Sequence, residues 1–176
     1  TFGFGQGIAT PFSDVPYLSN SIYGSFYKEL AQDFVSTIKY KVKSINAFSD
    51  KNVKLSDRIF LSESELRGFA FRGVGPKVDG EFIGGNYSYS TNFSTTLPNG
   101  LPESWETRSN IFVDVANVWG ADFSGAFDNN KVRSSAGLGF EWLSPLGPIS
   151  VTYAEPITKD SQDTIENFNF KIGSIF

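Results

Sequence analysis

Apolar and polar residues alternate along most of this chain. Between residues 82 and 97, the odd positions include Tyr87, Tyr89, Phe93 and Leu97, while the even positions from 86 onward are Asn, Ser or Thr. The same period of two recurs in four later segments, at residues 110–119, 132–143, 149–154 and 168–176. Alternation over such lengths is typical of β-strands that have one apolar and one polar face.

The N-terminal part of the chain predicts three further strands. Residues 34–45 place three lysines on one face and apolar side chains on the other, and residues 17–28 and 1–9 have a weaker strand pattern. Residues 29–33 are expected to form a hairpin connection. We therefore predict an all-β, antiparallel chain of about eight strands without a helix.

The predicted connections alternate between short and long. The short ones lie at 29–33, 98–108 and 144–148, and the long ones at 46–81, 121–131 and 156–167. Outer-membrane β-barrels have short turns on the periplasmic side and longer loops outside. If the C-terminus is periplasmic, a single topology places all three long loops outside. The pattern therefore favours a transmembrane β-barrel.

A soluble β-sandwich is the alternative, because globular antiparallel sheets also alternate. Two features favour the barrel. The polar faces consist mainly of small residues with single charges, which suits a crowded and wet lumen. Aromatic residues also gather near strand ends, as in the interfacial girdles of membrane barrels. These aromatic residues are Trp105, Trp119, Trp142, Tyr153 and Phe176.

Composition removes several classes of function. The chain of 176 residues contains no cysteine and no histidine, which excludes thiolate metal sites and Ser-His or Cys-His catalysis within it. We expect no enzyme, no cofactor and no metal. A net charge of −4 argues against a nucleic-acid partner. Because methionine is absent and Thr1 opens within a strand-like pattern, we expect a C-terminal piece of a longer protein.

The longest predicted loop carries an unusual motif. It reads Leu66-Arg67-Gly68-Phe69 and continues to Gly75-Pro76. Its apolar residues do not suit water and its arginines do not suit lipid, so we expect the loop to fold back into an enclosed, polar space. A solvated arginine is the alternative reading of Arg67. The strand facings place Asp114 and Asn92 on the polar face, where they are candidate partners of Arg67.

Four motifs together resemble the BamA family of outer-membrane protein assembly factors, also called the bacterial surface antigen family. The likeness runs from about residue 17 to the end and covers the C-terminal half of that family's barrel. The motifs are Leu66-Arg-Gly-Phe69 with Gly75-Pro76, Gly84-Gly85-Asn86, residues 112–119 (FVDVANVW) and residues 136–148 (AGLGFEWLSPLGP).

The resemblance implies that residues 1–176 supply eight strands of a sixteen-stranded barrel. The N-terminal half-barrel and the periplasmic POTRA domains would then lie outside this chain. It also implies that the loop at 46–81 is extracellular and folds into the lumen, with Arg67 against acidic residues of the wall. The family often has Glu where Asn92 stands, so Asp114 is expected to be the single carboxylate partner.

The implied function is non-enzymatic assembly and insertion of β-barrels in the outer membrane of a Gram-negative bacterium. In the family, the last strand meets the first at a weak seam, and we expect this seam to open and to template incoming strands. Here the last strand would contribute Phe168, Phe170, Ile172, Gly173 and Phe176. Implied partners are outer-membrane lipids, nascent barrel proteins and periplasmic accessory lipoproteins. A secretion pore of the TamA or two-partner type, and a small self-contained barrel, are the alternatives.

Overall fold

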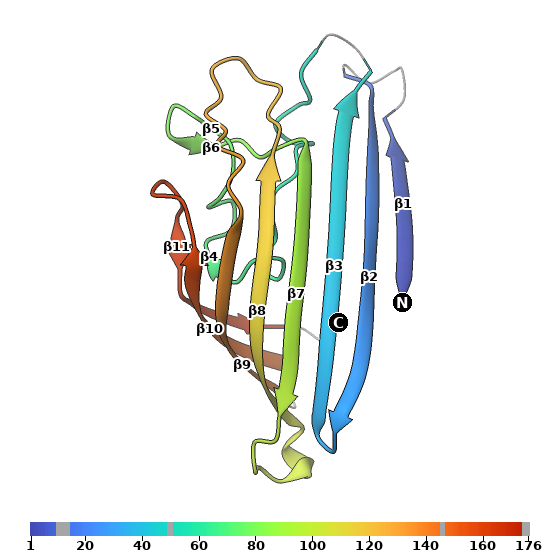
Figure 1. Ribbon diagram of the computed structural model, residues 1–176, viewed down its shortest axis with the longest axis vertical. Helices are drawn as coiled ribbons and strands as arrows, with labels where there is room; N and C mark the ends of the chain where they lie inside the picture. Colours follow the sequence, from blue (N-terminus) through green and yellow to red (C-terminus); the bar gives the residue numbers. More distant parts are fainter. Residues whose placement is uncertain (10–14, 49–50, 145–146, 174–176) are drawn as a thin grey trace.

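A computed structural model describes residues 1–9, 15–48, 51–144 and 147–173. One antiparallel sheet of eight strands dominates it, in the order β1-β2-β3-β7-β8-β9-β10-β12 (Figure 1). Its strands are β1 (Phe2–Ile8), β2 (Tyr17–Ala31), β3 (Phe34–Ala47), β7 (Tyr87–Leu97), β8 (Thr107–Trp119), β9 (Arg133–Ser144), β10 (Gly147–Thr158) and β12 (Phe168–Ile172). The sheet is open, and each strand lies beside the next large strand in the chain. The prediction of eight antiparallel strands is confirmed.

The long and short connections lie at opposite ends of the sheet, as the sequence predicts (Figure 1). The β2–β3 hairpin turns through two residues, and Asp33 takes a positive φ of 66° there. The turn between β7 and β8 contains a single short 3-10 helix, η1 (Glu103–Trp105). In the part of the chain that the structure describes, no helix has both the length and the apolar character needed to cross a membrane.

One predicted strand begins later than expected. The alternation predicts a strand from residue 82, but β7 begins at Tyr87. Residues 81–82 instead form β6 (Glu81–Phe82), which pairs with β5 (Lys77–Val78) in a small separate hairpin. The chain rejoins the large sheet, here also called the wall, at Asn86. The Asn86 carbonyl accepts a hydrogen bond from the Ile45 amide, and the Asn86 amide donates to the Gly120 carbonyl. The glycines at 84 and 85 therefore belong to the loop.

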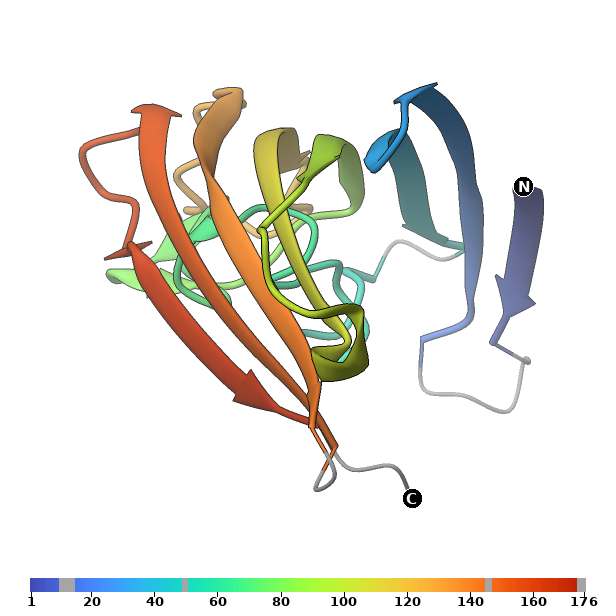
Figure 2. The same cartoon turned by 90° about the horizontal axis from the view of Figure 1, so that it is seen from below.

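The two faces of the sheet differ, as the alternation predicts. One row of neighbouring residues on the outward face reads Ile38, Phe93, Val113 and Ala136, and the adjacent row on the other face reads Lys39, Asn92, Asp114 and Ser135. Large apolar side chains of the outward face are exposed, including Phe4, Ile38, Val113 and Phe170. Figure 2 shows that the sheet curves around the segment between β3 and β7. No second sheet packs on the outward face of the described residues, so the sandwich alternative is wrong.

Candidate functional site

The segment at residues 51–86, here called the inserted loop, packs on the concave face of the sheet (Figure 2). Its apolar side chains and those of the wall form one buried cluster, which consists of Leu61, Leu66, Phe69, Val74, Ala116 and Val118, with Ile59 and Ile165 beside it. Small wall residues make room for the loop. Ser88, Ser90, Ala116 and Ser135 are all almost completely buried. The loop is therefore held by apolar contact before any charge is considered.

Arg67 and Asp114 form a two-bonded ion pair between the inserted loop and β8. The Arg67 Nε donates to Asp114 Oδ2 at 2.7 Å, and Nη2 donates to Oδ1 at 2.7 Å. The backbone amide of Arg67 also donates to Oδ2, at 3.1 Å. Asp114 has no exposed surface, whereas 22% of the Arg67 side chain is exposed. Two-pronged pairs of this kind combine directional hydrogen bonds with charge attraction, and are stronger than neutral bonds.

The Arg67 guanidinium also lies over an aromatic ring. Its central carbon is 3.3 Å from the centroid of Phe112, an arrangement that adds cation–π attraction. Gly137 of β9 makes room for that ring, because a Cβ there would lie 2.6 Å from Phe112 Cζ and 2.1 Å from the Tyr153 carbonyl oxygen. Gly137 therefore allows the close approach of β10 and leaves the space that the Phe112 ring occupies.

Gly68 is required next to Arg67 for two reasons. Its φ of 87° is rarely adopted by residues with a side chain, and a Cβ would lie 3.1 Å from Ala154 Cβ. This close approach allows β4 (Gly68–Phe69) to rest directly on β10. Further along the same motif, Gly75 lies against Val118, and Pro76 is fully buried.

Asn92, the predicted second partner, acts as a hydrogen-bond donor. Its side-chain amide donates to Asp114 Oδ1 at 2.8 Å and to the Glu65 carbonyl oxygen at 3.1 Å. A carboxylate at this position would lack both donated bonds. The single-carboxylate arrangement expected from the sequence is therefore complemented by an amide that bridges the wall and the loop.

Glu65 gives the loop a second charged anchor. Lys43 Nζ lies 2.7 Å from its carboxylate and Lys41 Nζ lies 3.4 Å away, both on β3. The Ser62 amide donates to the same carboxylate at 2.7 Å. Burial alone would raise the pKa of Glu65, but the bonds from Lys43 and Ser62 outweigh burial and hold the pKa below its usual value.

A second two-bonded ion pair joins the wall to the loop between β10 and β12. Arg133 of β9 donates to Asp163 through Nε at 3.1 Å and through Nη2 at 3.0 Å. Only 2% of the Arg133 side chain and 1% of the Asp163 side chain are exposed. Asp163 also accepts the Asp160 amide at 2.7 Å, which folds the loop around the pair.

The closing strand, β12, turns Phe168, Phe170 and Ile172 outward, where all three are exposed. Gly173 follows the strand, and its amide donates to the Pro148 carbonyl at 2.8 Å. Phe176, predicted to end the strand, lies outside the described residues. On the concave side, Lys171 pairs with Glu63 of the inserted loop at 2.6 Å.

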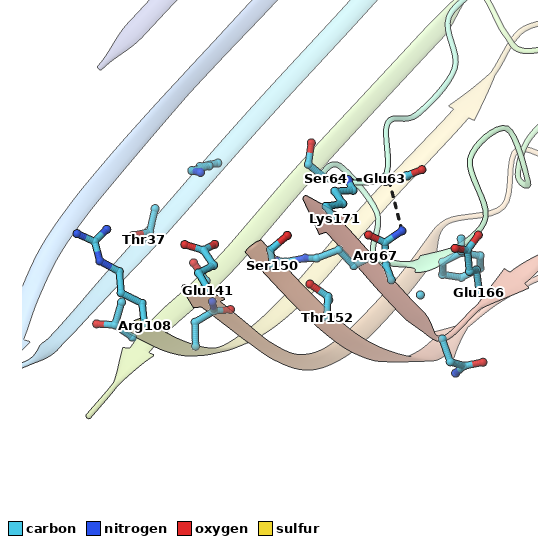
Figure 3. Close-up of a pocket in the computed structure, with 18 of the residues that line it drawn as sticks. Thr37, Glu63, Ser64, Arg67, Arg108, Glu141, Ser150, Thr152, Glu166 and Lys171 are labelled. Atoms are coloured by element: carbon cyan, nitrogen blue, oxygen red, sulfur yellow. Dashed lines mark hydrogen bonds and ion pairs between the residues drawn. The ribbon is translucent and has the colours of Figure 1, made fainter. Parts of the chain in front are cut away.

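A cavity of about 380 Å³ lies on the concave side of the sheet beside Arg67. Figure 3 shows side chains that line it. Charged residues of both signs line it, among them Glu63, Arg67, Arg108, Glu141 and Lys171. No group of three or more side chains suited to a metal ion occurs in the described residues. The arrangement places fixed charges of both signs around one open cavity.

Comparison with known proteins identifies the family. The model of the Omp85 superfamily domain matches residues 1–176. The chain belongs to the Omp85 superfamily.

Omp85 relatives match along nearly all of this chain. The outer membrane protein assembly factor BamA of Neorickettsia risticii is 28% identical over 178 residues, which is 98% of this chain and 24% of that protein. BamA of Neisseria meningitidis is 26% identical over 204 residues, and the alignment covers 99% of this chain and 26% of that protein. A SAM50-like protein of Schizosaccharomyces pombe is 24% identical over 92% of this chain and 35% of its own length. The chain spans about a quarter of the BamA sequences that it matches.

A solved Omp85 structure has the same fold. The crystal structure of BamA from Haemophilus ducreyi lacking POTRA domains 1–3 aligns with a TM-score of 0.80 and 28% identity. The alignment covers 98% of this chain and 38% of that chain. The predicted likeness to the C-terminal part of the BamA barrel is confirmed, together with the predicted fold class.

Sequence reasoning for this Omp85 chain missed three contributors to the site. Arg133 lies on the polar face of its predicted strand, but no motif in the sequence distinguishes it from other polar residues. Asp163 is one of several acidic residues in a polar loop. Glu65 directly precedes the Leu66–Phe69 motif and was not singled out. The three lysines of residues 34–45 form a basic row that needs an acidic partner, and that signal could have drawn attention to Glu65.

Proposed function

We propose that this chain is the C-terminal part of an outer-membrane β-barrel that assembles and inserts other β-barrels, without enzymatic chemistry. The Omp85 membership and the likeness to BamA along nearly the whole chain support this proposal. The observation that carries it is the inserted loop, which is held on the polar face by the Arg67–Asp114 pair. The outward face, with its exposed aromatic and aliphatic residues, suits contact with membrane lipid.

The proposed location is the outer membrane of a Gram-negative bacterium, with outer-membrane lipids around the strands. The proposed partners are nascent outer-membrane barrel proteins and periplasmic accessory lipoproteins. In this proposal, the long connections lie outside the cell and residues 46–81 fold back into the lumen. An N-terminal half-barrel and POTRA domains would complete the protein.

The mechanism that we propose places the active edge at the closing strand. β12 spans five residues in the described part of the chain, so it can form only a short ladder with the first strand of the full-length barrel, where the proposed seam lies. A short ladder opens more readily than a long one, because fewer backbone hydrogen bonds break. The opened edge would offer unpaired amide and carbonyl groups to an incoming strand, which would add by β-augmentation.

A disulfide lock tests the seam. One cysteine is introduced in β12 and one in the first strand of the full-length barrel, and assembly of a substrate barrel is measured before and after reduction. We expect assembly to stop when the lock is formed and to return when it is reduced. Undiminished assembly by the locked protein would contradict the proposed seam.

Substitution of Arg67 tests the role of the inserted loop. Arg67→Ala in the full-length protein removes both bonds to Asp114 and the contact with Phe112, so we expect impaired assembly and protease cleavage within residues 51–86. Arg72→Ala is the matched control, because Arg72 belongs to the same loop but its guanidinium lies over Phe60, 4.4 Å from the ring centroid. Normal assembly by the Arg67→Ala protein would contradict the proposed role.

A secretion pore is the second candidate, and the cavity beside Arg67, which charged side chains line, favours it. A pore would conduct ions or an unfolded chain once the loop undocks. Conductance of the Arg67→Ala protein in planar bilayers separates the two functions. A secretion pore predicts a large rise in conductance together with transport of a dedicated substrate, and an assembly factor predicts loss of barrel assembly without that transport.

A further inference from the structure

The closing strand is much shorter than its neighbour because the chain before it leaves the wall. β12 pairs with β10 from Ile149 to Tyr153, whereas β10 pairs with β9 from Gly147 to Thr158. Before β12, residues Ile165 and Glu166 form β11, which pairs with β4 of the inserted loop (Figure 1). The last part of β10 thus has no ladder with β11 or β12 in the described structure.

Asn167 stands at the point where the two pairings separate. The Ala154 amide donates to the Asn167 backbone carbonyl at 2.8 Å, and the Asn167 side-chain amide donates to the Ala154 carbonyl at 2.9 Å. One residue earlier, Glu166 already pairs with Gly68 of the inserted loop, and the contact with this loop continues back to Thr164. The Ala70 amide donates to the Thr164 carbonyl at 3.0 Å, and the Thr164 amide donates to the Gly73 carbonyl at 2.8 Å.

The register of β10 and β12 shows what the alternative pairing would be. Tyr153 pairs with Phe168, so continued pairing would set Glu155 opposite Glu166 and Pro156 opposite Ile165. Ala154 donates toward β12, and residues two apart point the same way, so Pro156 lies where the next donor is needed. Proline has no amide hydrogen, and two facing carboxylates repel. Both features weaken wall pairing without forbidding it.

The Arg133–Asp163 pair is compatible with either pairing. Ser134, which follows Arg133, pairs with Thr158 of β10. Continued pairing of the closing strand would bring Asp163 to the level of Thr158, next to Arg133. Asp163 and Asn167 therefore form two fixed points, and residues 164–166 between them face either the loop or β10.

The geometry points to a partner exchange in residues 164–166. These residues pair with β4 while Arg67 is bound to Asp114. Once the inserted loop undocks, they pair with residues 155–157 of β10. Docking of the loop thereby sets the length of the closing strand. Pro156 and the Glu155–Glu166 repulsion keep the wall-paired state weak, so that the exchange is reversible.

Cysteine crosslinking in the full-length protein tests the exchange, and the absence of cysteine from this chain makes the thiols specific here. The reporter carries Glu155→Cys and Glu166→Cys, which lie in disulfide range only when residues 164–166 pair with β10. We expect slow oxidation while Arg67 is present. With Arg67→Ala, the rate should rise about tenfold, because the broken ion pair no longer holds β4 against the wall.

A matched reporter inside the existing ladder controls for unfolding. Val151→Cys with Phe170→Cys joins residues that already pair, so it should oxidise quickly in both backgrounds. Asp114→Asn removes the charge on the β8 side of the same ion pair. It replaces Arg67→Ala in this experiment if the Arg67→Ala protein does not accumulate. An unchanged 155–166 rate in protein whose loop has become protease-sensitive would overturn the exchange. Loss of the 151–170 crosslink would also overturn it, since the closing strand would then unravel and not lengthen.

Discussion

Two of the arginine–aspartate pairs hold neighbouring loops on the same sheet, and the arginine lies on the loop in one pair and on the sheet in the other. At Arg67–Asp114, the arginine belongs to the inserted loop and the buried carboxylate belongs to β8. At Arg133–Asp163, the arginine belongs to β9 and the carboxylate belongs to the loop before β12. Arg67 borders a cavity, whereas both members of the second pair are enclosed. The first pair is suited to release, and the second to permanent attachment.

The largest expected effect is loss of the enclosed carboxylate. Asp163→Ala leaves the Arg133 guanidinium buried without its counter-charge, and we expect a loss of about 3–5 kcal/mol in the free energy of unfolding. Thermal unfolding of the full-length protein in detergent measures the change. The double variant Arg133→Met with Asp163→Leu removes both charges and should recover most of the stability. Equal instability of the single and double variants would show that hydrogen bonds to other groups dominate.

Asp114→Ala, the same change in the other pair, should cost less. Arg67 can turn toward the cavity and regain solvent, so we expect a loss of about 1–3 kcal/mol, with protease cleavage confined to the inserted loop. Arg67→Lys should fall in the same range, because lysine keeps the charge but loses the second bond and the stacking on Phe112. If Asp114→Ala destabilises the protein as much as Asp163→Ala, the distinction between a releasable and a permanent pair is wrong.

Acid should weaken the loop through Glu65. Its pKa is lowered in the folded protein below the ordinary value of 4.5 for a glutamate, so the stabilisation is present above that value and is lost as the pH falls through the lower folded pKa. We expect protease sensitivity of the loop to rise below about pH 4.5. Glu65→Gln should already be sensitive at pH 7 and show a flatter pH profile. An identical profile in both proteins would assign the acid response to other carboxylates.

The smallest expected effect is at Glu63. Its partner Lys171 is about half exposed, and exposed ion pairs contribute little. Glu63→Gln should change the free energy of unfolding by less than about 0.5 kcal/mol. Thermal unfolding at low and high salt checks this, and a larger, salt-dependent loss would place Glu63 with the structural anchors.

The strand pattern and the first ion pair could be predicted from the sequence, and the second pair could not. Alternation places Asp114 on the polar face, and the unusual Leu66–Phe69 motif identifies a loop that needs an enclosure. Arg133 and Asp163 are thirty residues apart and carry no such local mark, so only the folded loop brings them together. The ladder between β4 and β11 was also missed, because two-residue strands are too short to show periodicity.

The row of small buried residues on the wall has a consequence for transplantation. Ser88, Ser90, Ala116 and Ser135 give up volume that the inserted loop occupies. A barrel with ordinary side chains at these places would overpack if it received residues 51–86, even with Asp114 supplied. A functional graft must therefore carry a patch of β7, β8 and β9 along with the loop, so the loop and its wall can be exchanged between proteins only as one module.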